Sequence, residues 1–217
     1  MLRAGLFVMS LLLVGMVAGV GGYYAGGRSD AIDDSRPLIR LADRLIARGE
    51  GGEGLGKARQ DLLLSVQDPR LSNREDMLGA SLGTLSRSLA KRLAAERSDP
   101  SFSIIRQAGY ASGLETQLSQ PQLMALWLET VDMGRGPRGW VRGFYQASRS
   151  LYNRPPEQLG DEQFIRLVAV ATSPSQLHLD RPDPALEARV GQIRTSIKRH
   201  CAVVVDTAKP SPLCKHG

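Results

Sequence analysis

Arg87 and Lys91 are two cations one helical turn apart, in a segment that begins at Met77. Leucines recur through this segment at helical spacing, which predicts a long amphipathic helix with Arg87, Lys91 and Arg92 off its apolar stripe. Two cations on one helix face can hold a phosphate, because arginine donates two parallel hydrogen bonds and lysine supplies a point charge. A solvated helix surface would show the same residues, so the pattern leaves both interpretations open.

Other residues that support chemistry are sparse. His178, His200 and His216 do not have the spacing of metal ligands. The sequence contains no glycine-rich phosphate or dinucleotide motif and no serine-nucleophile motif. We therefore expect neither a metal site nor a cofactor.

The elements that must position these residues are helical. Apolar residues at helical spacing, with breaks at proline, glycine and serine, predict helices over 57–66, from 77 to a break at 98–101, and over 104–118, 121–133, 140–153, 161–172 and 184–205. Glycines at 134–139 turn the chain, and no convincing alternation predicts a strand. Aromatic residues make up only 5% of the chain, so the core must rest on aliphatic side chains. The expected fold is mainly α.

The N-terminus carries an uncharged run from Ala4 to Ala25, between Arg3 and Arg28. About twenty apolar residues cross a hydrocarbon core of roughly 30 Å. We expect one uncleaved transmembrane helix in the inner (cytoplasmic) membrane, with a cytoplasmic N-terminus and the remaining chain on the periplasmic side. A cleaved signal peptide is the alternative interpretation.

The chain then divides into four parts by composition. Residues 1–27 form the cytoplasmic stub and anchor, 28–56 a juxtamembrane helix and linker, 57–205 the main domain, and 206–217 a tail. Ser35-Arg36-Pro37 predicts a helix start, since proline is tolerated in the first turn. The glycine-rich stretch 49–56 predicts a flexible break.

Charge and cysteine content narrow the partners and the compartment. The net charge of +6 suits an anionic membrane surface or an acidic ligand. We do not expect nucleic acid, because no basic run is interleaved with aromatics. Cys201 and Cys214 both follow the anchor, and a disulfide between them would close a loop of about a dozen residues and contribute about 2–3 kcal/mol. Two free thiols are the alternative.

A series of landmarks in the second half of the chain points to a family. The series comprises Leu-Met-x-x-Trp-Leu-Glu at 123–129, Gly-x-Gly at 134–136, Arg-Gly-Phe-x-x-Ala-Ser at 142–148, Tyr-x-Arg-Pro at 152–155 and Glu-x-Leu at 157–159. In this order it resembles the peptidoglycan glycosyltransferases (glycosyltransferase family 51), over about residues 57–199. The resemblance implies a lysozyme-like transglycosylase domain.

The resemblance also implies where catalytic carboxylates should stand. The glutamate that acts as general base in the family corresponds to Gln67, and a second glutamate corresponds to Gln107, counted back from Glu115. An amide cannot accept a proton near neutral pH, and a general base contributes about 10²- to 10⁴-fold in rate. Arg106 partly compensates for cations lost beside Gln107.

The second family motif corresponds to residues 83–92. Its hydroxyls and lysine hold a lipid diphosphate in the family, which assigns that role here to Thr84, Ser86 and Lys91. Arg87 adds a further positive charge.

Three functions follow as hypotheses. The first is a degenerate transglycosylase that binds lipid-linked precursor, glycan strands or other cell-wall enzymes. The second is an active glycosyltransferase that uses Asp68, Glu75 or Asp76 instead. The third is a lysozyme-like hydrolase, which would need a well-placed acid that the sequence does not offer.

Overall fold

The structure is a computed structural model that describes residues 2–67, 77–97, 104–136 and 139–204. Within these ranges, the side chains at 2–8, 10–12, 77–82, 96–97 and 199–204 lie outside the description. Asp68, Glu75, Asp76 and the proposed Cys201–Cys214 disulfide therefore also lie outside it.

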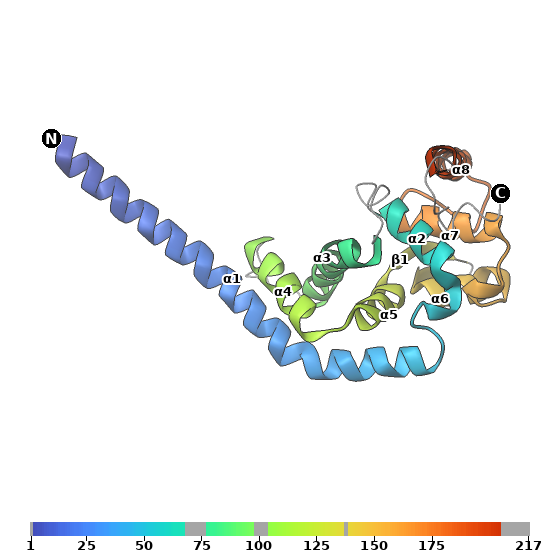
Figure 1. Cartoon of the computed structure of the whole chain (residues 1–217), viewed down its shortest axis with the longest axis horizontal. Helices are drawn as coiled ribbons and strands as arrows, with labels where there is room; N and C mark the ends of the chain where they lie inside the picture. The colour runs from blue at the N-terminus through green and yellow to red at the C-terminus, as the bar shows by residue number, and fades with distance from the viewer. Residues whose placement is uncertain (1, 68–76, 98–103, 137–138, 205–217) are drawn as a thin grey trace.

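The chain is mainly helical, as predicted. The elements in order are α1 (Leu2–Ala47), the 3-10 turn η1 (Glu53–Leu55), α2 (Gly56–Gln67), α3 (Met77–Arg97), α4 (Ile104–Gln117), α5 (Gln120–Thr130), β1 (Asp132–Gly136), β2 (Gly139–Arg142), α6 (Phe144–Tyr152), the 3-10 turn η3 (Pro156–Gln158), α7 (Asp161–Thr172) and α8 (Pro184–Val204). Figure 1 shows α1 extending well beyond the other elements at its N-terminal end.

The first helix is continuous where the sequence predicts a new start at Ser35. Pro37 lies inside α1, and the helix changes direction in its last third (Figure 1). Proline removes one backbone hydrogen bond and kinks a helix without always ending it. Ala31 and Leu45 are buried on either side of Pro37, so tertiary packing holds both halves in place. In the part of the chain that the structure describes, no helix has a stretch both long and apolar enough to cross a membrane.

Helices α1 and α4 touch backbone to backbone. A Cβ added at Gly27 would lie 2.0 Å from the Arg106 carbonyl oxygen, and one at Gly109 would lie 2.0 Å from the Tyr24 carbonyl oxygen. Polar contacts continue the interface: Arg106 Nε donates to Asp30 Oδ2 at 2.8 Å. α4 is therefore held in register along α1.

Gly109→Ala should destabilise the protein by about 1–3 kcal/mol through overpacking at this crossing. Denaturant unfolding measures the loss. Gly191→Ala on α8 is the matched control, because nothing lies within 4 Å of its Cβ position, and alanine in a helix is more stable than glycine by about 0.5–1 kcal/mol. Equal effects in the two variants would contradict the close crossing.

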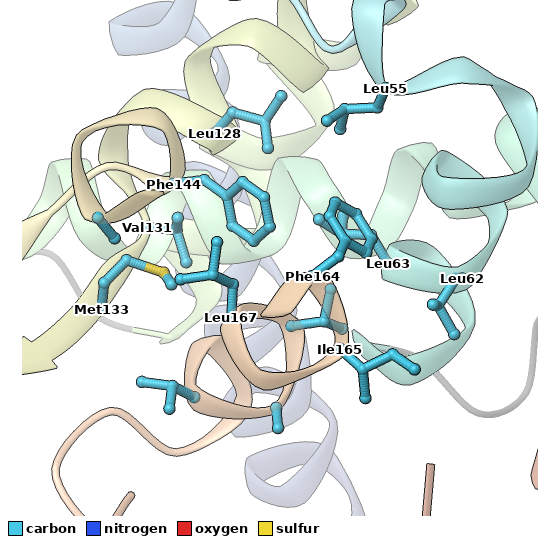
Figure 2. Close-up of a cluster of buried hydrophobic side chains, with 14 of the residues drawn as sticks. Leu55, Leu62, Leu63, Leu128, Val131, Met133, Phe144, Phe164, Ile165 and Leu167 are labelled. Carbon is cyan, nitrogen blue, oxygen red and sulfur yellow. The ribbon is translucent and has the colours of Figure 1, made fainter. Parts of the chain in front are cut away.

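Two apolar clusters share α5. The first joins α2, α5, α6, α7, α8 and the hairpin, and Figure 2 shows Phe144 and Phe164 among its side chains, their ring centroids 5.7 Å apart. The second joins α1, α3, α4 and α5. α5 is buried all round from Leu123 to Leu128, as expected for a helix with apolar residues on every face.

The predicted turn at 134–139 belongs to an antiparallel hairpin of β1 and β2, with Arg135 opposite Trp140. The predicted helices 121–133 and 140–153 are therefore wrong at 132–133 and 140–142. Gly143 has φ 93° between β2 and α6, a left-handed backbone that a helix cannot pass through and that favours glycine. Gly143 therefore sets the start of α6, whereas α5 ends at Thr130, where Val131 turns to an extended backbone.

Arg59 fastens α2 to the segment that leads into α7. Its guanidinium donates to the carbonyl oxygens of Pro156 at 3.0 Å, Glu157 at 3.2 Å and Leu159 at 2.6 Å. It also donates to Asp161 Oδ1 at 3.1 Å and lies over the Phe164 ring. This contact fixes the helix whose last residue is Gln67.

Candidate functional site

The second-motif residues lie on α3 and face two directions. Thr84, Arg87 and Lys91 follow at helical spacing on one face, where Arg87 and Lys91 are exposed. Within the described residues, neither cation makes a hydrogen bond or ion pair. Ser86 points away from that face and is fully buried.

Ser86 forms a hydrogen bond with a residue of α4. Its hydroxyl donates to Glu115 Oε1 in a short hydrogen bond. The Cβ position of Gly83 lies 3.7 Å from Glu115 Oε1 and 3.9 Å from Arg87 Nη2, so both side chains approach the same turn of α3. The structure thus brings a carboxylate to the second motif, and the Ser86 hydroxyl is engaged by it.

In the sequence, Glu115 served only to locate Gln107, and we assigned it no role of its own. Its proximity to Ser86 could not be found from spacing, because the two residues belong to different helices. The hydrogen bond places the Glu115 carboxylate directly beside the second motif.

The two amides occupy separate helices that both pack against α3. Gln67 ends α2 and is partly exposed, and its Nε2 is buried without a hydrogen-bond partner among the described residues. Gln107 is partly exposed in the first turns of α4, next to Arg106 and its ion pair with Asp30. No carboxylate stands at either position.

The prediction that Arg92 lies off the apolar stripe of its helix is wrong. Its guanidinium lies 5.3 Å from the centre of the Trp127 ring, and its Nε and Nη2 are buried without hydrogen-bond partners in the part of the chain that the structure describes. Burial lowers the pKa of Arg92 to about 10, opposed by the charge of Asp132 and reinforced by that of Arg142. The aromatic face supplies the attraction that allows this burial.

Asp61 is a buried carboxylate on α2 that the sequence did not single out. It is 2% exposed and lies 3.5 Å from Lys57 Nζ. Burial raises the pKa of the Asp61 carboxyl above its usual value, and the charge of Lys57 opposes the shift. The sequence shows that Asp61 stands six residues before Gln67, but it does not show that Asp61 is buried, because burial depends on tertiary packing.

Asp61→Asn should gain stability relative to the wild type as the pH rises. The raised folded-state pKa means that Asp61 is easiest to bury when protonated, so it costs stability increasingly as the pH passes upward through that pKa. Urea unfolding at about pH 4 and about pH 7 measures the difference. Asp180→Asn, at an exposed position, is the control. A relative stability of Asp61→Asn that does not change with pH would contradict this.

One comparison with known proteins gives a match. A family model described as Transglycosylase matches residues 65–198, which run from the end of α2 into α8 and cover more than half of the chain. No curated protein and no solved structure matches the chain. With the ordered landmarks and the second motif on α3, this match shows that the chain belongs to the transglycosylase family, glycosyltransferase family 51.

Proposed function

We propose that this chain is a membrane-anchored member of the family that binds lipid-linked peptidoglycan precursor or glycan strands without polymerising them. Family membership supports peptidoglycan glycosyl units as the ligand class. The proposal rests on a mismatch: two exposed cations on α3 pair with no described residue, while the position that the family resemblance assigns to the general base holds the amide Gln67. A site of this kind can still bind a phosphate but has no group that accepts a proton from the substrate.

The anchor is supported by the exposed part of α1. Every residue from Leu13 to Ala25 is exposed, and none is charged. A helix of this composition is disfavoured in water and suits a bilayer. Residues 4–12 complete the uncharged run, and apart from Met9 their side chains lie outside the description. We propose with this anchor a location in the inner membrane, with the domain on the periplasmic side.

Incubation of the full-length protein with labelled lipid II and with purified sacculi tests the proposal. We expect saturable lipid II binding, no glycan polymer and no cleavage of sacculi. The Gln67→Glu/Gln107→Glu double variant reinstates both carboxylates, so polymer from that variant alone would tie the loss to the two amides. Polymer from the wild type would overturn the proposal, and binding only to another cell-wall enzyme would redirect it.

An active glycosyltransferase is the second candidate, and the Ser86–Glu115 contact favours it. Glu115 is an exposed carboxylate beside the second motif, and a carboxylate is a group that can act as a general base. If wild-type protein makes polymer, Glu115→Gln should abolish it under this candidate. Loss on changing Asp68, Glu75 or Asp76 instead would assign the chemistry to one of those acids.

A further inference from the structure

The hairpin of β1 and β2 has one face in the core and one face in solvent. Met133 is buried, and Val141 packs against the first apolar cluster. Side chains alternate along a strand, and directly opposed residues of an antiparallel pair share a face. The outer face therefore carries the two charged or aromatic residues of β2 and their cross-strand partners, namely Trp140, Arg142, Arg135 and Asp132.

Trp140 is held in place and is still exposed. Its indole Nε1 donates to Asp132 Oδ1 at 3.3 Å. Trp140 nevertheless remains 55% exposed, whereas Trp127, the other tryptophan of the chain, is 2% exposed. A tryptophan stabilises a fold through the apolar area that it removes from water, and Trp140 leaves much of that area in solvent. Its ring is therefore oriented by a hydrogen bond while much of its surface is accessible to a ligand.

Charged groups surround the Trp140 ring. Arg135 stands directly across from it, is exposed, and makes no hydrogen bond or ion pair with any described residue. Arg142 is also exposed, and its Nε donates to the Thr130 carbonyl oxygen at 3.2 Å. Asp132 adds a carboxylate. An aromatic face with donors and an acceptor at its rim is complementary to a sugar ring, because a sugar presents C–H groups on its face and hydroxyl or amide groups at its edge.

The position of the hairpin favours a sugar over a lipid. Figure 1 shows β1 far from the N-terminal end of α1, along the long axis of the molecule, and the exposed apolar residues 13–25 belong to that end. Asp132 and Arg142 lie close enough to Arg92 for their charges to act on its pKa. Arg92 directly follows Lys91, so the hairpin adjoins the helix that carries the exposed cations.

We propose that Trp140 is a stacking platform for a sugar ring of a peptidoglycan glycan, and that Arg135 binds a carboxylate on the peptide of the same ligand. This inference rests on the proposed function, because family membership supplies the ligand class. The planar guanidinium of arginine matches a carboxylate. Stacking needs no proton transfer, so the platform accounts for glycan binding by a chain whose general-base position is an amide.

Tryptophan fluorescence of the full-length protein in detergent tests the inference, because the chain has two tryptophans and Trp127 is buried. Chitotetraose is the uncharged probe. A soluble disaccharide-peptide of N-acetylglucosamine and N-acetylmuramic acid is the probe that bears carboxylates. We expect both probes to protect Trp140 from acrylamide quenching in a saturable way, and isothermal titration calorimetry to give affinities independent of the fluorescence.

Trp140→Ala is expected to weaken binding of both probes about 10-fold, through loss of one stacking contact. Trp140→Phe keeps an aromatic face, so calorimetry should show an affinity within about 3-fold of the wild type while the protection signal disappears. Thermal melts verify that both variants are folded.

Arg135→Gln is expected to weaken only the disaccharide-peptide, by about 3-fold, because the arginine is exposed and its ion pair is screened. The variant leaves the indole and its bond to Asp132 in place, so it tests the site even if Trp140→Ala does not fold. Arg36→Gln, at an exposed arginine of α1, is the charge-matched control and should bind both probes like the wild type.

Unchanged affinity of folded Trp140→Ala, or failure of the wild type to bind either probe while it binds lipid II, would overturn the inference and leave the proposed function standing. Absence of binding to lipid II and to both probes would overturn the two together. Protection of Trp140 on reconstitution into phosphatidylcholine–phosphatidylglycerol vesicles, without protection by either probe, would assign the hairpin to the lipid surface and also overturn the inference.

Discussion

Arg87→Ala/Lys91→Ala is expected to weaken lipid II binding by about 10- to 100-fold. Each cation on the exposed face of α3 can donate a charge-assisted hydrogen bond to a phosphate, and such bonds contribute about 1.5–3 kcal/mol, less at exposed positions. The loss should shrink at high ionic strength, because the interaction is screened. Titration of labelled lipid II in detergent, with inorganic pyrophosphate as competitor, measures the change.

Arg40→Ala/Arg44→Ala is the charge-matched control. These arginines have the same spacing as Arg87 and Lys91, and both are exposed on α1. A general effect of net charge would weaken binding equally in the two double variants. An equal loss would therefore remove α3 from the binding site.

The second large effect is expected for Arg59→Ala, which should cost about 3 kcal/mol of stability. The guanidinium serves three carbonyl oxygens and one carboxylate between Pro156 and Asp161. Its removal leaves carbonyl groups without a donor at the joint between α2 and α7. For a domain of this size the melting temperature should fall by about 6–12 °C.

Arg59→Lys separates geometry from charge. Lysine keeps the positive charge but cannot reach several carbonyl oxygens with one planar fork, so most of the loss should remain. Arg189→Ala, where the side chain donates only to Gln192 among described contacts, should change stability by less than about 0.5 kcal/mol. Full stability in Arg59→Lys would show that charge alone matters.

Most helices could be predicted because their signals are local. The structure places α2 at Gly56–Gln67, α4 at Ile104–Gln117 and α7 at Asp161–Thr172, close to the predicted 57–66, 104–118 and 161–172. Leucine spacing and flanking proline or glycine residues determine such segments with little help from the rest of the chain.

The errors occur where distant contacts override local signals. The sequence around Pro37 predicts a helix start, but buried residues on both sides of Pro37 keep α1 continuous. The sequence predicts that Trp140 begins a helix, but in the structure it pairs with Arg135 across the hairpin. Propensity is a weak guide at such positions, because packing and pairing with residues far along the chain contribute more free energy.

The sequence by itself determined the family, because the order of landmarks needs no coordinates. It also predicts that Gln67 and Gln107 occupy the carboxylate positions of the family, a prediction that rests on residue identity alone. Only the tertiary structure decided that Ser86 is bonded to Glu115, that Arg92 is buried against Trp127, and that α4 rests on α1 through Gly27 and Gly109. These contacts join separate helices, and helical periodicity specifies which face is apolar but not which partner covers it.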